Sequence, residues 1–319
     1  MFPFGFRVLG RTSASRRPVN WDKAFAAYCQ CDPRADLVAP AWMSAFRFGE
    51  DFRSYLESHG TTKGYAGPTW SQWLWFDIDA EHIGFAADGT RRLVEAIANR
   101  YGVGPDNLLL FFSGRKGFHV GVPLSLCGSP PPSNEFHRTC RGLAEHLAMI
   151  AGVEIDAGIY DRIRLLRSPN SRHEKTGLHK VHTRFAELSD PIRVLEKAKA
   201  PFPVTLPPFP PPNPTAVDDW SGAEQETRAE ADGKAAFRTD GEGRLNRLTK
   251  ELIRGSLPSV GDRHRMLFSS AANLAEHGVP GSVIRELLLD PGLDCGLPPA
   301  EVERQIKCGI EHGSRGRKD

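Results

Sequence analysis

The chain has 319 residues, of which 40% are hydrophobic and 25% charged, and its formal net charge at pH 7 is +2. This length accommodates one large domain and one small domain, and a charge near neutrality requires any nucleic-acid site to be a local patch. No stretch approaches the roughly 20 apolar residues of a membrane span, and the basic segment Met1–Arg17 lacks the apolar region of a secretory signal. The expected location is therefore cytoplasmic, with no membrane partner.

Helices and strands are predicted to be mixed in the first part of the chain. Helix-spaced apolar residues predict helices over Trp21–Cys29 and Trp42–Ser58, with Gly60 as a stop signal. Aromatic and β-branched residues predict a buried strand over Trp70–Ile78. The elements predicted next are a helix over Thr90–Tyr101 closed by Gly102, strands over Leu108–Phe112 and Phe118–Val122 joined by a glycine-containing loop, and a helix over Ser133–Ile150 capped by Ser133 or Asn134.

A change of composition marks the predicted domain boundary. Eight of the fourteen residues from 201 to 214 are proline, which favours extended polyproline II structure. Residues 218–243 are rich in Ala, Gly, Asp and Glu with little apolar periodicity, which is typical of a mobile tether. The predicted domains are a catalytic domain over residues 1–195, a flexible linker over 196–242 and a helical domain over 243–319. The four helices predicted in the last domain are Arg244–Arg254, Asp262–His277, Ser282–Asp290 and Pro299–His312.

Asp77 and Asp79 form a D-x-D pair at the end of the predicted strand Trp70–Ile78. Side chains at positions i and i+2 of a strand point to the same face, so both carboxylates can converge on one point. Hard divalent cations such as Mg²⁺ or Mn²⁺ prefer such oxygen ligands. A lone D-x-D is a weak signal, because the motif occurs by chance and then marks a polar strand end that faces water.

Two basic segments follow the carboxylate pair. The first, residues 113–119, reads SGRKGFH and lies between two predicted strands, where glycine allows close backbone approach and Arg115 and Lys116 can neutralise phosphate charge. The second, Tyr160–Arg184, contains seven Lys or Arg residues and three His against two acidic residues. Alone, each segment also fits an ordinary basic turn or a solvated basic face.

The order of these motifs resembles that of the catalytic subunit of archaeo-eukaryotic primases and their primase-polymerase relatives. The resemblance covers roughly residues 65–185. It is carried by Asp77-x-Asp79, Ser113-Gly-Arg115-Lys116-Gly-x-His119, an apolar residue before Asp156, and Leu165-Leu166-Arg167-Ser-Pro-x-Ser171-x-His173-x-Lys175-Thr176-Gly177. It implies an α+β fold with an RRM-like antiparallel core, an additional α/β layer and, here, a small all-α C-terminal domain.

The resemblance also implies roles for individual positions. Asp77, Asp79 and Asp156 correspond to the catalytic carboxylates that bind Mg²⁺ or Mn²⁺. The residues that correspond to the binding site for the phosphates of the incoming nucleotide are Ser113, Arg115, Lys116 and His119, with Arg167 and His173 as a further basic pair. The implied activity is template-directed transfer of nucleotides, from NTPs or dNTPs, to a 3′-hydroxyl on a single-stranded DNA template.

Features outside this region leave some alternatives open. Residues 261–265, GDRHR, and the segment from Leu297 resemble a small helical domain appended to plasmid and phage primases, which indicates replication of such an element. There is no GxxxxGK[ST] motif, so a partner helicase would be a separate chain. Cys29 and Cys31 could bind zinc with a distant histidine, although no CxxC pair is present. The rival functions are a DNA-repair polymerase, a metal-dependent glycosyltransferase and a non-catalytic nucleic-acid-binding module.

Overall fold

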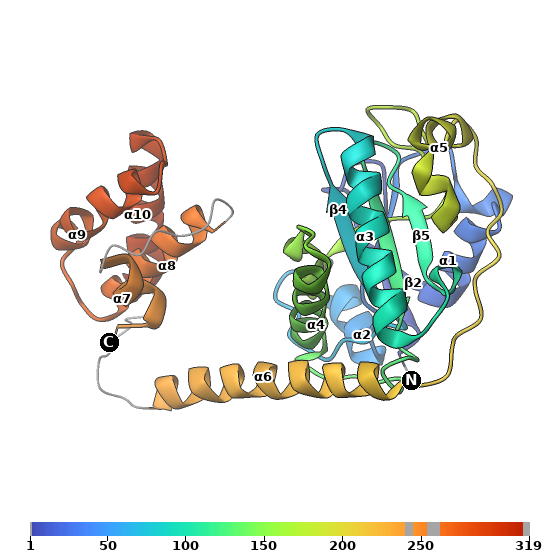
Figure 1. Cartoon of the computed structure of the whole chain (residues 1–319). Helices are drawn as coiled ribbons and strands as arrows, with labels where there is room; N and C mark the ends of the chain where they lie inside the picture. The colour runs from blue at the N-terminus through green and yellow to red at the C-terminus, as the bar shows by residue number, and fades with distance from the viewer. Residues whose placement is uncertain (1, 240–244, 254–261, 315–319) are drawn as a thin grey trace. The chain divides into compact units, whose positions relative to one another are not determined.

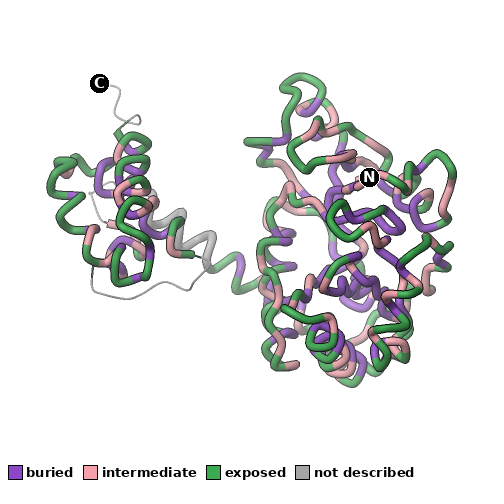
Figure 2. The backbone as a smooth tube through the Cα atoms, turned by 90° about the horizontal axis from the view of Figure 1, so that it is seen from above, coloured by how far each residue is buried: buried purple, intermediate pink, exposed green. Residues whose placement is uncertain are grey.

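The computed structural model of the chain describes residues 2–239, 245–253 and 262–314. The chain forms two compact units, Met1–Ala231 and Asp232–Asp319 (Figure 1). Each unit has a hydrophobic core of its own, and the buried positions of each lie on the inward-facing sides of its elements (Figure 2). None of the described helices combines the length and the apolar character that crossing a membrane requires.

The N-terminal unit is an α+β structure with two antiparallel sheets. The first has the strand order β2-β1-β3-β7 and the second the order β4-β6-β5. The strands are β1 (Phe4–Leu9), β2 (Arg17–Asn20), β3 (Ala41–Ser44), β4 (Trp73–Asp79), β5 (Leu109–Phe112), β6 (Gly117–Pro123) and β7 (Leu165–Arg167). The helices of this unit are α1 (Trp21–Cys29), α2 (Glu50–His59), α3 (Ile83–Tyr101), α4 (Phe136–Ala151), α5 (Pro191–Lys197) and most of α6 (Pro214–Thr239).

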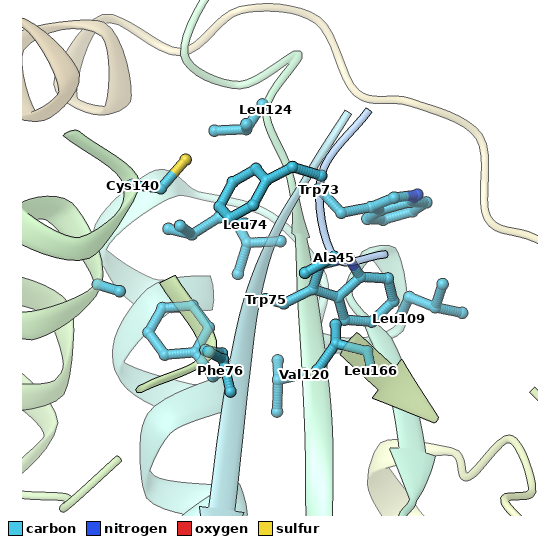
Figure 3. Close-up of a cluster of buried hydrophobic side chains, with 14 of the residues drawn as sticks. Ala45, Trp73, Leu74, Trp75, Phe76, Leu109, Val120, Leu124, Cys140 and Leu166 are labelled. Atoms are coloured by element: carbon cyan, nitrogen blue, oxygen red, sulfur yellow. The ribbon is translucent and has the colours of Figure 1, made fainter. Parts of the chain in front are cut away.

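Strand β4 separates two layers of the core. Leu74 and Phe76 point to the side that α3 and α4 cover, whereas Trp73 and Trp75 point to the opposite side (Figure 3). The ring of Trp75 lies 6.4 Å from that of Phe25, measured between centroids, which places this second side of β4 against α1 and the first sheet. All residues of β4 before Asp77 are buried, so the strand is anchored on both faces and its polar end is held in place.

Several predicted elements agree closely with the structure, and others do not. Helix α3 begins at Ile83, seven residues before the predicted start, and the residue at the N-cap of α4 is Glu135 and not the predicted Ser133 or Asn134. The helix Trp21–Cys29 and the hairpin strands β5 and β6 are present at or within one residue of their predicted positions, and α3 ends at Gly102, which has the left-handed conformation that favours glycine. The predicted helix Trp42–Ser58 is wrong in its first part. Strand β3 occupies 41–44 because its backbone pairs with β1 and β7, and only 50–59 are helical.

The segment predicted to be a flexible linker is instead largely docked on the N-terminal unit. Its proline-rich part is extended. Backbone groups of this part form hydrogen bonds with the rest of the N-terminal unit. The backbone N–H of Val204 donates to the carbonyl of Cys29 at 2.8 Å, and the hydroxyl of Ser125 donates to the carbonyl of Pro210 at 2.7 Å. The ring of Phe209 also lies 5.0 Å from that of Trp73.

Helix α6 follows, where the sequence predicted a tether. Its buried residues repeat at helical spacing, with Trp220 packed 5.3 Å from the ring of Phe136. Asp219 accepts two hydrogen bonds from Arg100, both at 2.6 Å, and one from the hydroxyl of Tyr101 at 2.9 Å. The sequence did not predict this helix because its other buried positions are small or polar residues, which give little contrast in hydropathy with the exposed ones. These positions are Ala216, Ala223 and Thr227.

The C-terminal unit is helical among the residues that the structure describes, as predicted. Its helices are α7 (Arg247–Ile253), α8 (Arg263–Glu276), α9 (Gly281–Asp294) and α10 (Pro299–Ser314). Met266, Leu267, Ile284, Leu288 and Val302 are among the residues of its core. Gly261 of the GDRHR motif and both ends of the predicted helix Arg244–Arg254 lie outside the described residues.

Candidate active site

The carboxylates of Asp77 and Asp79 lie at the end of β4. Strand alternation puts them on the face of Trp73 and Trp75, which looks toward the first sheet. The side chain of Asp77 is 20% exposed and that of Asp79 is 49% exposed. Asp77 is therefore the more buried of the two carboxylates, and Asp79 is open to solvent.

His119 faces Asp77 across the sheet. The two residues are direct partners in the register of β6 and β4, and His119 Nε2 is 3.5 Å from Oδ1 of Asp77. Among the residues that the structure describes, neither that oxygen nor Nδ1 of His119 has a hydrogen-bond partner. Burial, aided by the charges of Lys180 and Arg167, lowers the pKa of His119 well below its usual value. At neutral pH His119 is therefore uncharged and can offer a ligand a hydrogen bond but no positive charge.

The third carboxylate, Asp156, reaches the same place from the chain after α4. Its backbone N–H donates to the carbonyl of Asp77 at 3.0 Å. Its side chain accepts from the backbone N–H of Gly158 at 2.8 Å and from Arg164 Nη2 at 3.1 Å. The structure thus brings the three predicted carboxylate residues into one neighbourhood, although they are far apart in the sequence.

The charges of these carboxylates affect one another. Burial and the neighbouring charges of Asp79 and Asp156 raise the pKa of Asp77 to about 7. The unpartnered, buried Oδ1 of Asp77 and this mutual repulsion both fit a bound hard cation, which would favour the ionised carboxylates. Within the described parts of the chain, however, no group of three or more His, Cys, Asp or Glu side chains stands ready to hold a metal ion. In this structure Asp79 lies 3.6 Å from Lys116 Nζ, and Asp156 is paired with Arg164.

The loop between β5 and β6 brings its basic residues to the carboxylates. Gly117 has no room for a side chain, because a Cβ atom there would lie 2.5 Å from the backbone carbonyl oxygen of Ile78 and 2.0 Å from Oδ1 of Asp79. The hydroxyl of Ser113 accepts from the N–H of Gly117 at 3.2 Å, which closes the turn. Lys116 faces Asp79, and Arg115 is exposed. The glycine allows the turn to pass directly against the carboxylate.

The second basic segment packs onto this turn. The hydroxyl of Thr176 donates to the carbonyl of Gly114 at 2.6 Å, which joins the two loops. Nδ1 of His173 accepts from the N–H of Lys175 at 3.1 Å, and burial together with the charges of Arg167 and Arg115 lowers the pKa of His173 to about 4. His173 is therefore neutral at physiological pH. The expected basic pair carries one positive charge, on Arg167, and not two.

Arg167 is the last residue of β7, in the first sheet. Its guanidinium lies 4.1 Å from the centre of the Trp42 ring, its direct partner on β3, and Nη1 donates to the carbonyl of Arg172 at 3.2 Å. Burial lowers its pKa to about 10, so it stays charged at neutral pH. The site is therefore built between the two sheets, with Asp77 and Asp79 on one sheet and Arg167 on the other.

Two cations at the site were not singled out by the sequence. Arg164 pairs with Asp156, and Lys180 is buried near Asp77 and His119. Both belong to the basic segment Tyr160–Arg184, but nothing in their spacing distinguishes them from its exposed members. The zinc alternative at Cys29 and Cys31 gains no support, because burial raises the pKa of the Cys29 thiol to about 12 and so disfavours the thiolate that zinc binds.

Comparison with known proteins adds little to this geometry. No protein-family model matches the chain, and no curated protein matches it. Among solved structures, one described as the crystal structure of primase RepB' is similar, with a TM-score of 0.40 and 12% sequence identity over 100% of this chain and 95% of the other. A similarity at this level supports neither a shared family nor a role for any residue.

Proposed function

We propose that the chain is a DNA primase-polymerase, a nucleotidyltransferase that joins NTPs or dNTPs to a 3′-hydroxyl on a single-stranded DNA template. The observation that carries the proposal is the meeting of Asp77, Asp79 and Asp156 with the cations of two basic loops in one place between the sheets. The order of the motifs along the sequence supports the same reading. We propose as well that the catalytic core is RRM-like and that the protein replicates a plasmid, a phage or a similar element.

In this proposal, Asp77, Asp79 and Asp156 hold Mg²⁺ or Mn²⁺. Such ions, when bound, would activate the attacking hydroxyl and offset charge on the departing pyrophosphate. The reaction forms a bond between the 3′-oxygen and the α-phosphorus and breaks the bond to the pyrophosphate oxygen. For Lys116 and Arg164 this assignment means a change of partner, since both now pair with the carboxylates.

The cations and the neutral histidines serve the triphosphate. Arg115, Lys116 and Arg167 supply positive charge to the phosphate oxygens, which is the main protein contribution to phosphoryl transfer. His119 and His173 are uncharged and contribute hydrogen bonds. Ser113 holds the turn through Gly117 and adds its hydroxyl at the edge of the loop.

One incubation tests the proposed function. The protein is mixed with unprimed or primed single-stranded DNA, Mn²⁺ or Mg²⁺, and either NTPs or dNTPs, and the products are sized. Products without a primer identify a primase, and extension of a primer alone identifies a polymerase of the repair kind. Absence of any incorporation under all these conditions would refute the proposal, and a glycosyltransferase or a non-catalytic DNA-binding module would give that result.

The structure predicts different effects for the loss of Arg167 and the loss of His173, because only Arg167 is charged at neutral pH. Arg167→Ala should raise the nucleotide KM and lower kcat, each change costing on the order of tenfold, because a charge-assisted hydrogen bond contributes about 1.5–3 kcal/mol. His173→Ala should cost only severalfold, because a neutral hydrogen bond contributes about 0.5–1.5 kcal/mol.

Steady-state kinetics of primer extension measures both variants, with Arg193→Ala as the matched control, since Arg193 is exposed on α5. Equal losses for Arg167→Ala and His173→Ala would show that His173 carries a charge in the working enzyme. Wild-type kinetics for both would remove the Tyr160–Arg184 segment from the nucleotide site.

A further inference from the structure

Lys180 is a buried cation that none of the roles above uses. Only 2% of the residue is exposed, and its ammonium lies between two aromatic rings, 5.5 Å from the centre of Trp75 and 4.9 Å from that of Phe111. No carboxylate forms an ion pair with it among the residues that the structure describes. Nζ instead donates to a backbone carbonyl, that of Arg167, at 2.8 Å.

Folding stability does not explain a lysine at this position. Burial lowers the pKa of Lys180 to about 7, which means that a charged ammonium at this position lowers the stability of the folded protein. A methionine of similar length would fill the space between the two rings without that cost. A residue that weakens the fold at neutral pH is a candidate for a functional role.

The backbone of Lys180 binds the same loop as its side chain. Its N–H donates to the carbonyl of Ser171 at 3.0 Å, and its carbonyl accepts from the N–H of Asn170 at 2.7 Å. Together with the bond from Nζ to Arg167, these contacts hold both ends of the segment from Arg167 to Ser171. The residue after that segment, Arg172, supplies the carbonyl to which the Arg167 guanidinium donates.

A small cavity shows why this loop depends on support. It has a volume of about 20 Å³ and is lined by Lys180, Arg167 and Ser168, among others. Ser168 itself is buried, with 1% of the residue exposed. The packing beside Arg167 is thus incomplete, and the bond from Nζ of Lys180 to the Arg167 carbonyl ties this part of the loop to the core.

We infer that Lys180 is a positioning residue of the nucleotide site: it holds the carbonyl of Arg167, and with it the loop that sets the direction of the Arg167 guanidinium toward the triphosphate. The inference rests on the proposed function. It assigns Lys180 no contact with the substrate. Its ammonium also adds positive charge beneath Asp77 and His119, whose pKa values both respond to it.

Three variants test this role: Lys180→Met, Lys180→Arg and the control Lys199→Met, in which an exposed lysine is changed. Each is examined for the nucleotide KM and kcat, for the Kd of a nucleoside triphosphate with Mn²⁺ by calorimetry, and for the thermal unfolding midpoint. Lys180→Met should raise both KM and Kd about tenfold, as expected when Arg167 is no longer held, with a smaller change in kcat. Lys180→Arg, which can still donate to the carbonyl, should recover most of the affinity.

The unfolding midpoint distinguishes positioning from a structural role. Lys180→Met should unfold close to the wild-type temperature, because removal of the buried charge offsets loss of the hydrogen bond to the Arg167 carbonyl. Wild-type KM and Kd in Lys180→Met would overturn the inference, and so would a lowered midpoint with no recovery in Lys180→Arg.

The binding measurement keeps this test separate from that of the proposed function. If the wild-type chain binds the triphosphate but incorporates no nucleotide, the proposed function fails and the ratio of Kd values still decides the role of Lys180. If the wild-type chain binds no triphosphate, both fail.

Discussion

Replacing Asp77 and Asp79 together with alanine is expected to abolish nucleotide incorporation with any divalent ion, while binding of single-stranded DNA persists. In the proposed mechanism these carboxylates hold the ions that activate the hydroxyl and screen the triphosphate, so their loss removes the largest contribution to the rate. DNA binding depends instead on Lys and Arg near the phosphates, and the loss of two negative charges should leave it unchanged or stronger. Primer extension and a filter-binding assay measure the two properties.

The stability of this double variant provides an independent check. Because the pKa of Asp77 is raised to about 7 in the folded protein, the folded state binds more protons than the unfolded state between about pH 4 and pH 7, and wild-type stability falls across that range as pH rises. The double variant has no Asp77 carboxyl, so its stability does not fall for this reason as pH rises. Without divalent ions, its stability relative to wild type should therefore be greater at pH 8 than at pH 5.

Asp88→Ala is the matched control, because Asp88 is exposed on α3 and its ion pair is with Arg92 at 3.4 Å. It should retain full incorporation. A double variant of Asp77 and Asp79 that still extends primers would refute the carboxylate assignment and most of the proposed function with it.

Removing α6 is expected to destabilise the N-terminal unit by at least about 3 kcal/mol, the lower end of the cost of removing a buried Trp side chain. A fragment of residues 1–206 lacks Trp220 and the Asp219 carboxylate that Arg100 and Tyr101 share. It also lacks Phe209, which covers Trp73. A fragment of residues 1–231 keeps all of these contacts.

Urea denaturation of the two fragments measures the difference, with Trp220→Ala in the full chain as the point variant. The fragment 1–231 should also retain primer extension in the proposed function, because every candidate site residue lies within it. Equal stability of the two fragments would show that α6 is dispensable for the fold and would restore the original description of this segment as a linker.

The candidate site shows what local sequence determines and what it does not. The D-x-D pair at a strand end predicts two carboxylates on one face, since the alternation of a strand is a local property. Whether a third carboxylate joins them depends on the bond between the Asp156 N–H and the Asp77 carbonyl, which links segments far apart in the chain. The charge of His119 and His173 could not be predicted either, because burial sets it and burial is a property of the packed protein.

By itself the sequence determined the elements whose signals are local: α1, the β5–β6 hairpin, the end of α3 at Gly102 and the helical nature of the C-terminal unit. Only the tertiary structure decided that residues 41–44 are a strand, because their partners in β1 and β7 are distant in sequence. It also decided that the supposed tether is docked, since Trp220 and a row of small residues find complementary surfaces on α4 and elsewhere in the N-terminal core. Lys180 belongs to the same class: a lysine in a basic run reads as solvated until packing puts it between two aromatic rings.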